Sequence, residues 1–482
     1  MPFRGRGGFT LAVTGAVVLS LALDSFRLAK SGLTFDEAAT IAYARLDVRS
    51  LFAALQSSDV FFGAYYGWMH VWMRLGESEA VLRWFSILCA AGAVIALAFL
   101  ARRLSDTKAG VAAAILAATS PLLFDLARQA RPYSLLVLVA ALSSLAFLRA
   151  SERPSWPRWT WYVLISAAGC YVHLFLLCLG AAHALWAVIC RRDLYRSGLT
   201  WALVAIAFST TPLLVVLHHY PSVNGYIARP TWRALVETWD WFAGSRVLVV
   251  LTLVLVAAWI TVRLHRRQRI LTSKVLFLIA TIAVPPLLVF AESLILKPSY
   301  MQRYLVEAWP SYIVALAIIL TRLRPLYLVP VAALVLALQT GAIVRTHMIV
   351  AQNWRTASSV IFAGELPGDQ LVVFPAFGML PYEYYRERLR VSGTPALRFP
   401  RLPPFPLTMT NNDSNKFAID RGALVATADR PSRIWFLVGW TDDPRTGQGL
   451  RILTRALPSG YRLALERRLV HETVLRYDLK KG

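Results

Sequence analysis

Long apolar runs separated by short polar loops occupy the first 346 residues of this chain. A helix needs about 20 predominantly apolar residues to cross the hydrocarbon core of a bilayer. The pattern therefore predicts an α-helical polytopic membrane protein with about 11 transmembrane helices. The expected spans lie near residues 9–29, 84–101, 108–124, 132–149, 158–172, 173–190, 199–218, 247–263, 271–296, 305–321 and 326–346.

The pattern changes after residue 347. Runs with strand-like composition alternate with helix-like runs, and a stretch rich in Pro and Asn, 399–413, separates them. We expect two units: a transmembrane domain over 1–346, with a long first loop at 30–83, and a small extracytoplasmic α/β domain over 347–482. The strand-like runs are 370–376, 434–440 and 473–479, and the helix-like runs are 381–389 and 447–457.

Composition supports the membrane assignment. Hydrophobic residues make up 57% of the chain and charged residues 16%, against roughly 25% charged residues in ordinary soluble domains. The net charge of +24 raises the question of a nucleic-acid partner, but no recognition motif accompanies the basic residues and none is expected. The four cysteines fall in or beside the expected spans, so they indicate no disulfide framework.

The basic residues gather in alternate loops. This is the positive-inside pattern, and it leaves the long, chemically mixed loops on the extracytoplasmic side. The N-terminal run at 9–23, preceded by Arg4 and Arg6, is expected to stay as a signal anchor, with a cleavable signal peptide as the alternative. The loops assigned to the cytoplasm contain Arg102, Arg103, Lys108, Arg149, Arg153, Arg158, Arg191, Arg192, Arg196, Arg263, Arg266, Arg267, Arg269, Arg322 and Arg324.

Two adjacent carboxylates, Asp36 and Glu37, follow the first expected span. One interpretation is structural: Asp36 caps a helix that begins at Glu37. The other is catalytic: Asp36 is a general base for an attacking hydroxyl, and Glu37 orients it or holds the acceptor. The loop around them is rich in aromatic residues, which fits interfacial amphipathic helices or an ordinary aromatic belt equally well.

Positive charge is predicted on the same side of the membrane as the acidic pair. Guanidinium groups bind phosphate in a bidentate manner, and Lys adds a point charge. Any one of these cations also fits a snorkelling anchor at a span end, but outward-facing cations run against the positive-inside bias. The candidate anion-binding residues are Arg128, Arg131 and Tyr133 before one span and Lys297, Arg303 and Tyr304 before another.

The histidines are weaker signals. His173 lies where two short apolar runs meet, and it fits either a buried structural histidine or a phosphate or sugar contact. His218 and His219 are adjacent but have no further ligands at a useful spacing, so the sequence leaves a metal requirement undetermined. It indicates no cofactor.

Taken in order, these segments resemble the GT-C glycosyltransferases, in particular the dolichyl-phosphate-mannose-protein mannosyltransferase-like and aminoarabinose-transferase-like enzymes. The resemblance covers roughly residues 9–346, although 61-FFGAYYGW-68 lacks the proline pair that relatives often carry. The segments that carry it are the acidic pair, 78-SEAVLRWFS-86, 128-RQARPYSLL-136, 171-YVH-173 and 299-SYMQRYLVEAWP-310.

The resemblance implies an inverting transfer of a sugar from a polyprenyl-phosphate donor to the hydroxyl of an extracytoplasmic acceptor. It assigns the base to Asp36, with Glu37 in support, and the donor phosphate or sugar to Arg131, Tyr133, Arg303 and Tyr304. His173 and Arg83 are weaker assignments. The expected partners are the lipid-linked donor, membrane lipids and an acceptor that is a lipid, a glycan or a protein.

A second hypothesis is a flippase or transporter of lipid-linked sugars. Transporters place ionisable groups or broken helices near mid-bilayer, and Glu292 is the main candidate for such a group here. A third hypothesis, a non-catalytic scaffold that displays the C-terminal domain, leaves the charged outer turns unexplained. The sequence identifies neither the sugar nor the acceptor.

Overall fold

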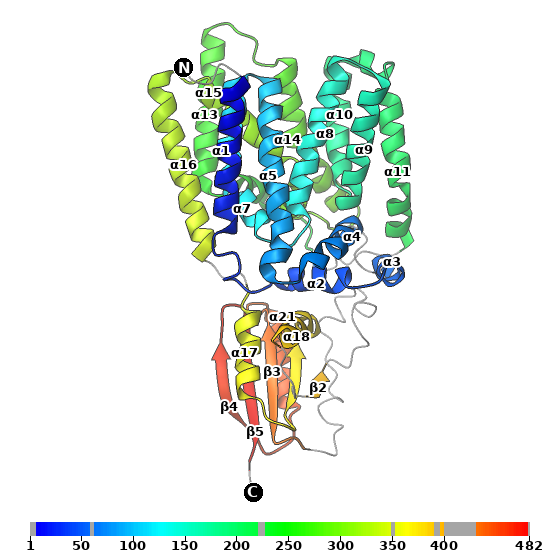
Figure 1. Ribbon diagram of the computed structural model, residues 1–482, viewed down its shortest axis with the longest axis vertical. Helices are drawn as coiled ribbons and strands as arrows, with labels where there is room; N and C mark the ends of the chain where they lie inside the picture. Colours follow the sequence, from blue (N-terminus) through cyan, green and yellow to red (C-terminus); the bar gives the residue numbers. More distant parts are fainter. Residues whose placement is uncertain are drawn as a thin grey trace.

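The structure is a computed structural model, and it describes residues 6–57, 62–219, 227–348, 352–389, 396–399 and 430–480. A bundle of helices forms one end of the molecule, and a unit built on a β-sheet lies against the other end (Figure 1). We call residues 6–348 the helical bundle and residues 352–480 the C-terminal unit. The N terminus lies at the end of the bundle away from the C-terminal unit.

The helices of the bundle occur where the apolar runs predict them. Each of the eleven expected ranges overlaps one helix, except that 108–124 is divided between α6 and α7. The helices that match the apolar runs are α1 (Arg6–Ser25), α5 (Glu79–Leu104), α6 (Thr107–Ala118), α7 (Pro121–Ala127), α8 (Tyr133–Glu152), α9 (Trp156–Val172), α10 (Leu176–Cys190), α11 (Leu199–His219), α13 (Arg246–His265), α14 (Ser273–Ile295), α15 (Trp309–Thr321) and α16 (Pro325–Met348).

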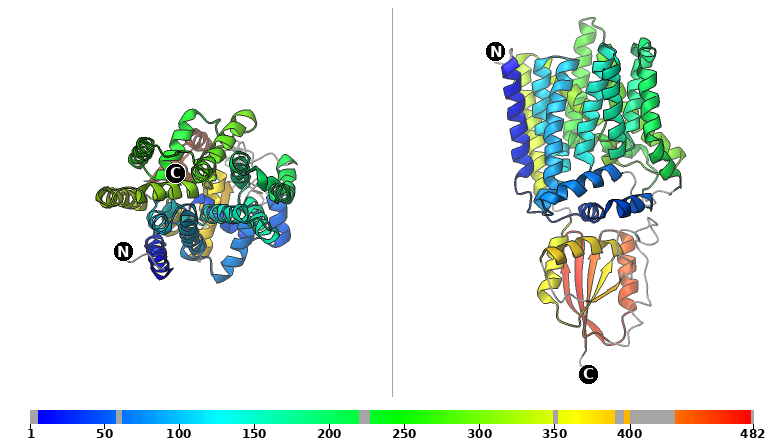
Figure 2. Two further views of the ribbon diagram at one scale, coloured as in Figure 1. Left: turned by 90° about the horizontal axis from the view of Figure 1, so that it is seen from above. Right: turned by 45° about the vertical axis from the view of Figure 1, so that its right-hand side comes forward.

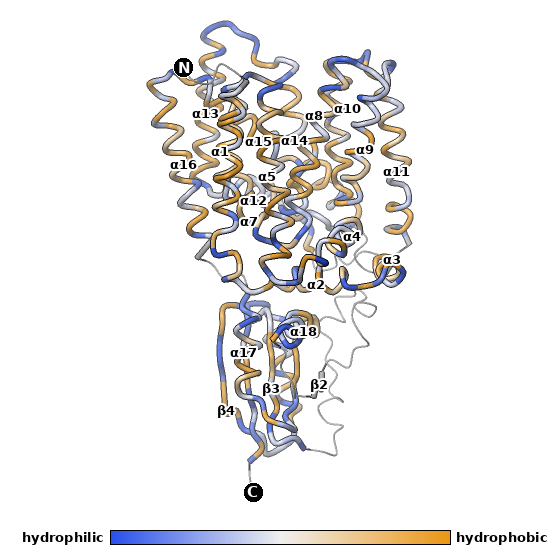
Figure 3. The backbone as a smooth tube through the Cα atoms, in the orientation of Figure 1, coloured by the Kyte–Doolittle hydropathy of each residue, from blue (hydrophilic) through white to orange (hydrophobic). Residues whose placement is uncertain are grey.

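Among the described residues, seven helices are by themselves long and apolar enough to cross a membrane, and the bent pair α6 and α7 makes eight. Two more, α10 and α15, are apolar but shorter. Hydrophobic residues extend along the bundle helices and polar residues collect at their ends (Figure 3). The prediction of a multi-pass α-helical membrane protein is confirmed, with fewer full-length spans than the eleven apolar runs suggest.

The bend between α6 and α7 has a local cause. Ser120 caps α7 by accepting a hydrogen bond from the amide of Leu123, and Pro121 occupies the first turn. Proline has no amide hydrogen to continue the preceding helix. The two helices therefore meet at 56°, and the chain from α7 to Tyr133 passes close to the acidic pair.

Short helices connect α1 to α5 and lie across the end of the bundle that faces the C-terminal unit (Figure 2). They are α2 (Phe35–Ala44), α3 (Val48–Ser57) and α4 (Gly63–Trp72), followed by a single turn at Met73–Leu75. Their aromatic side chains do not form one exposed belt: Tyr65 and Tyr66 are fully buried, and only residues such as Trp68 are exposed. Another short helix, α12 (Trp232–Ala243), precedes α13.

The C-terminal unit contains a five-stranded sheet of order β2-β1-β3-β5-β4. Strands β1 (Gln370–Phe374), β2 (Ala396–Phe399) and β3 (Arg433–Gly439) are parallel, whereas β5 (Glu472–Leu479) pairs antiparallel with β3 and with β4 (Tyr461–Arg468). The helices are α17 (Trp354–Gly364), α18 (Met379–Arg388) and α21 (Pro444–Arg455). The three expected strands and two expected helices are present; β2, β4 and α17 were not anticipated, and most of the stretch 399–413 lies outside the described residues.

Candidate active site

The acidic pair lies in the first turn of α2, and Thr34 is the residue that caps this helix. The Thr34 hydroxyl accepts a hydrogen bond from the amide of Glu37 at 3.3 Å, and Glu37 accepts one from the amide of Thr34 at 2.9 Å. This reciprocal pair is a capping box. The interpretation in which Asp36 caps a helix from Glu37 is therefore wrong, because the helix begins two residues earlier and Thr34 already satisfies its end.

Glu37 is completely buried and forms a two-pronged ion pair with Arg83 of α5. The Arg83 Nε and Nη2 groups donate to its two carboxylate oxygens at 2.7 and 2.8 Å, and the amide of Ala130 adds a bond of 3.0 Å. Burial raises the pKa of Glu37, but the charge and hydrogen bonds of Arg83 outweigh it and hold the pKa below its usual value. Glu37 therefore has no exposed surface, and its carboxylate contacts Arg83 and the backbone around it.

Asp36, the neighbouring residue, remains partly exposed and faces two arginines from distant turns. Arg303, in the 3-10 turn Gln302–Leu305, donates from Nη1 to Oδ2 of Asp36 at 3.0 Å. The Nε atom of Arg131 lies 3.9 Å from the same oxygen, and Arg131 Nη1 donates to the backbone carbonyl of Asp36 at 3.3 Å. The structure thus brings together the acid and two of the arginines selected from the sequence.

An aromatic cluster borders these arginines. The ring of Tyr304 lies 5.0 Å from that of His173 and 6.4 Å from that of Tyr133. Phe62, which precedes α4, contacts all three rings and lies 4.9 Å beneath the guanidinium of Arg131. In the sequence Phe62 is one residue of an aromatic run, and its position beside Arg131 depends on how the first loop folds back onto the bundle.

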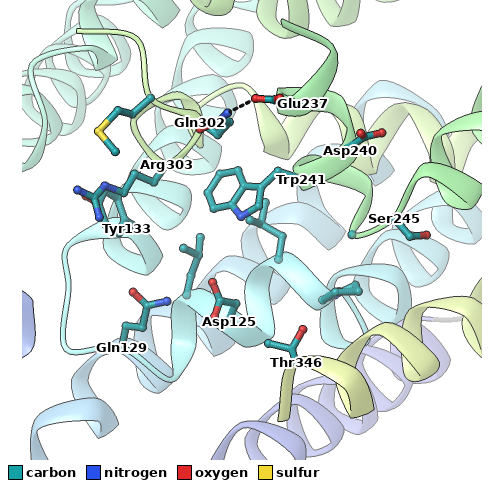
Figure 4. A pocket seen from close by; sticks show the side chains of 15 residues that line it. Asp125, Gln129, Tyr133, Glu237, Asp240, Trp241, Ser245, Gln302, Arg303 and Thr346 are labelled. Atoms are coloured by element: carbon teal, nitrogen blue, oxygen red, sulfur yellow. Dashed lines mark hydrogen bonds between the residues drawn. The ribbon is translucent and has the colours of Figure 1, made fainter. Parts of the chain in front are cut away.

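Two cavities meet at Arg303. The first, of about 380 Å³, is lined by Asp36 and by basic side chains, among them Arg27, Lys30 and Arg128. The second, of about 710 Å³, lies between α7, α12 and the turn that carries Arg303 (Figure 4). Both cavities are lined by Asp125, Gln129, Arg303 and Thr346.

The second cavity has a different character from the first. Glu237, Asp240 and Trp241 line it, and Glu237 accepts a hydrogen bond from Gln302 at 3.3 Å (Figure 4). Carboxylates beside an aromatic ring suit the hydroxyl groups and apolar face of a sugar. Glu237, Asp240 and Trp241 are not among the residues predicted from the sequence, where the available signal was the amphipathic run 237-ETWDWFAG-244.

The remaining predicted residues separate into two groups. Arg128 lines the first cavity, and its Nη1 donates to the backbone carbonyls of Asp24 and Phe26 at 2.8 Å. Lys297 is exposed, and it lines neither cavity. The structure therefore places Arg128 beside Asp36 and leaves Lys297 outside the cluster.

Comparison with known proteins adds a finding about the fold. A family model described as dolichyl-phosphate-mannose-protein mannosyltransferase matches residues 64–216. The structure is similar to that of ArnT from Cupriavidus metallidurans bound to undecaprenyl phosphate, with a TM-score of 0.62, 13% sequence identity and 98% of each chain covered. The chain has the GT-C glycosyltransferase fold.

Two further structures with the GT-C fold are similar. Arabinofuranosyltransferase AftD from Mycobacteria gives a TM-score of 0.51 at 15% identity, covering 99% of this chain and 40% of that chain. The oligosaccharyltransferase of Archaeoglobus fulgidus gives 0.50 at 12% identity, covering 96% and 74%. No curated protein matches the chain significantly in sequence. The resemblance noted in the sequence is thus confirmed, and at these identities it establishes the fold.

Within this GT-C fold, the C-terminal unit contacts the segment that carries the acidic pair. The hydroxyl of Tyr385, in α18, accepts a hydrogen bond from the amide of Leu33 at 2.7 Å, and Gln352 accepts one from the amide of Phe35 at 2.6 Å. The ring of Phe35 also packs 4.8 Å from that of Phe377. The segment just before Asp36 is therefore held between Arg83 on the bundle side and Tyr385 and Gln352 on the other.

The described residues contain no group of three or more His, Cys, Asp or Glu side chains arranged to hold a metal ion. His218 lies near the end of α11 with an exposed side chain.

Proposed function

We propose that this protein is a membrane glycosyltransferase that moves a sugar from a polyprenyl-phosphate donor to a hydroxyl of an extracytoplasmic acceptor. One observation carries the proposal. A partly exposed carboxylate, Asp36, lies in a cavity 3.0 Å from the guanidinium of Arg303 and 3.9 Å from that of Arg131. A base and an anion-binding pair within one cavity are what transfer from a phosphate leaving group requires.

The proposed reaction is a single displacement. Asp36 takes the proton of the acceptor hydroxyl as its oxygen attacks the anomeric carbon of the sugar. The bond between that carbon and the phosphate oxygen breaks, and its electron pair leaves with the polyprenyl phosphate. Attack from the face opposite the leaving group inverts the anomeric configuration.

The cations suit the leaving group. Arg303 lines both cavities, and Arg128, Arg27 and Lys30 line the cavity that contains Asp36. Guanidinium groups held in place before the reaction stabilise charge as it develops on the phosphate. In this proposal Arg303 contacts the phosphate most directly, with Arg131 and Arg128 in support.

The aromatic cluster suits the sugar. Tyr133 and Tyr304 present ring faces and hydroxyl groups beside the two arginines. Aromatic faces pack on the apolar face of a sugar ring, and hydroxyl groups donate and accept hydrogen bonds. We assign donor-sugar contacts to Tyr133, Tyr304 and His173, all three of which are buried.

The membrane orientation follows from charge. The helix ends far from Asp36 carry clusters of basic residues, such as Arg102 and Arg103 at the end of α5 and Lys108 at the start of α6. By the positive-inside rule these ends face the cytoplasm, so the site faces the extracytoplasmic side. We accordingly propose a bacterial inner-membrane protein with a transmembrane domain over 1–346 and an extracytoplasmic domain over 347–482.

The transporter hypothesis receives no specific support. Glu292, its main candidate, lies in the last turn of α14 and accepts a hydrogen bond from the hydroxyl of Ser299. An ionisable group at the end of a span, bonded to a neighbouring loop, is not a mid-bilayer site.

The test is reconstitution of the purified full-length chain in vesicles that contain polyprenyl-phosphate-linked hexoses or pentoses and a candidate acceptor. We expect release of polyprenyl phosphate together with a glycosylated acceptor, both measured by mass spectrometry. If the lipid-linked sugar crosses the bilayer intact while none of it is consumed with any acceptor, the protein is a flippase and the proposal is wrong.

A further inference from the structure

A third cavity lies far from Asp36, in a recess at the other end of the bundle. It has a volume of about 470 Å³ and is formed by α5, α8 and α9. Phe99, near the end of α5, lines the recess. This end of α5 lies beside the start of α1, because the guanidinium of Arg102 packs 4.6 Å from the ring of Phe9. The N terminus lies at the end of the bundle away from the C-terminal unit (Figure 1). This recess is therefore separate from the candidate active site.

Small residues create the recess. Gly92 and Ala96 on α5 and Ala146 on α8 are among the residues that line it. Phe99 and Trp161 form its sides, and both are exposed, Trp161 by 64%. Apolar side chains exposed along a membrane-spanning helix face lipid acyl chains, so the recess is a groove that opens toward the bilayer.

Two arginines line the groove at its end nearest the membrane surface. Arg149 lies in the last turn of α8 with an exposed side chain, and it makes no hydrogen bond or ion pair with any residue that the structure describes. Arg158, in the first turn of α9, donates from Nη1 to the carbonyl of Arg153 at 2.7 Å. The nearby acid Glu152 is already paired with Arg103 at 2.5 Å. The end of the groove therefore carries uncompensated positive charge.

The dimensions of the groove suit part of an acyl chain. Leu142 and Arg149 both line it from α8, and the seven residues from one to the other rise by about 10 Å along a helix. One leaflet of the hydrocarbon core is about 15 Å deep, half of a core about 30 Å thick. A chain that enters beside Arg149 would thus reach well toward the middle of the bilayer.

We propose that this groove binds an anionic phospholipid, with its phosphate on Arg149 and Arg158 and one acyl chain between α5 and α8. The apolar groove suits part of an acyl chain, and the two guanidinium groups at its membrane-surface end suit the phosphate of the same lipid. A zwitterionic lipid offers the same acyl chain but less net charge to the arginines. The site does not depend on the proposed transfer reaction.

The experiment is native mass spectrometry of the purified full-length chain with equal amounts of phosphatidylglycerol and phosphatidylcholine that carry identical acyl chains. We expect retention of phosphatidylglycerol in preference to phosphatidylcholine. Each arginine near an anionic headgroup should account for roughly a fivefold preference. The double variant R149A/R158A should lose that preference, whereas R153A/R324A, which removes two basic residues that do not line the groove, should keep it.

A second variant tests the groove itself without changing charge. Ala146→Leu fills the hollow between α5 and α8 and should reduce retention of both lipids, with an unchanged melting temperature in lipid-free detergent as the folding control. The proposal is overturned if the wild-type chain retains the two lipids equally, or if R153A/R324A loses the preference as R149A/R158A does. It is also overturned if polyprenyl phosphate displaces phosphatidylglycerol from the groove at equal concentration.

Discussion

Arg303 Nη1 donates a hydrogen bond of 3.0 Å to Oδ2 of Asp36, although the two residues are 267 positions apart in the chain. The contact joins the first turn of α2 to the turn that precedes α15. It places a carboxylate and a guanidinium at the same cavity wall, where one can accept a proton and the other can bind a phosphate. Both halves of the proposed reaction can be tested separately through this pair.

Asp36→Asn keeps the size of the side chain but removes the base. We expect sugar transfer to fall by about 10²- to 10⁴-fold, the usual contribution of a general base, while donor binding changes little. Steady-state transfer and donor binding to the detergent-solubilised protein are the two measurements. Transfer at the wild-type rate would reject the assignment of the base to Asp36.

Arg303→Ala should weaken donor binding by roughly 10- to 100-fold, because a hydrogen bond to a charged group contributes about 1.5–3 kcal/mol. Arg303→Lys should recover part of this affinity, since the charge returns without the bidentate geometry. Lys297→Ala is the matched control, because Lys297 is exposed and lines neither cavity. Equal affinity of R303A and wild type for the lipid-linked donor would contradict the phosphate role.

The ion pair between Glu37 and Arg83 should dominate the local stability of the first loop. Removing one partner of a buried pair costs about 3–5 kcal/mol, because the other charge remains buried without compensation. We therefore expect Glu37→Gln to lower the melting temperature in detergent markedly. Arg45→Ala, which breaks the partly exposed pairs with Glu77 and Glu387, should cost about 0–1 kcal/mol for each pair. Similar melting temperatures for the two variants would contradict the structure here.

The same ion pair predicts a dependence of stability on pH. The pKa of Glu37 in the folded protein lies below its ordinary value of 4.5. Its contribution is therefore fully present above pH 4.5 and is lost as the pH falls through the lower pKa of the folded state. The difference in melting temperature between wild type and Glu37→Gln should be constant above pH 4.5 and should shrink below it. A difference in melting temperature that grows on acidification would contradict a lowered pKa of Glu37 in the folded protein.

Contacts from the C-terminal unit should position Asp36. A Cβ atom at Gly32 would lie 2.9 Å from the Tyr385 hydroxyl and 3.1 Å from the Cβ of Arg355, so Gly32→Ala should displace the segment before α2 and lower kcat. Tyr385→Phe removes the atom in the closest clash, although it also removes the acceptor for Leu33. The double variant should therefore lose less activity than the two single losses combined.

The readout that separates positioning from general damage is the split between kcat and donor binding. We expect kcat to fall in Gly32→Ala while the dissociation constant of the donor stays near the wild-type value, because Arg303 is on a different element. Strictly additive losses in the double variant, or equal losses of kcat and of affinity, would reject the positioning role.

Several features of this protein were predictable from local sequence alone. An apolar run of about 20 residues satisfies its backbone hydrogen bonds within one helix, so the positions of the spans could be predicted. The concentration of arginines at one end of the spans and the change of composition after residue 347 are also visible in the sequence itself. The two turns that carry Arg131 and Arg303 could also be selected from the sequence. The start of α2 differs from the prediction. The sequence suggests a helix from Glu37 capped by Asp36, whereas the structure has a capping box between Thr34 and Glu37.

Tertiary structure alone decided which of two adjacent acids is available for chemistry. Helical geometry points Asp36 and Glu37 about 100° apart, and only the packing of α5 and of the chain at Ala130 shows that Glu37 is the one buried against Arg83. The cavity wall shared by Asp36 and Arg303, the exposure of Lys297 and the place of Trp241 depend in the same way on segments far apart in the chain. Hydrophobic periodicity is a local property that the sequence determines directly, whereas a cavity exists only where distant surfaces fail to fill the space between them.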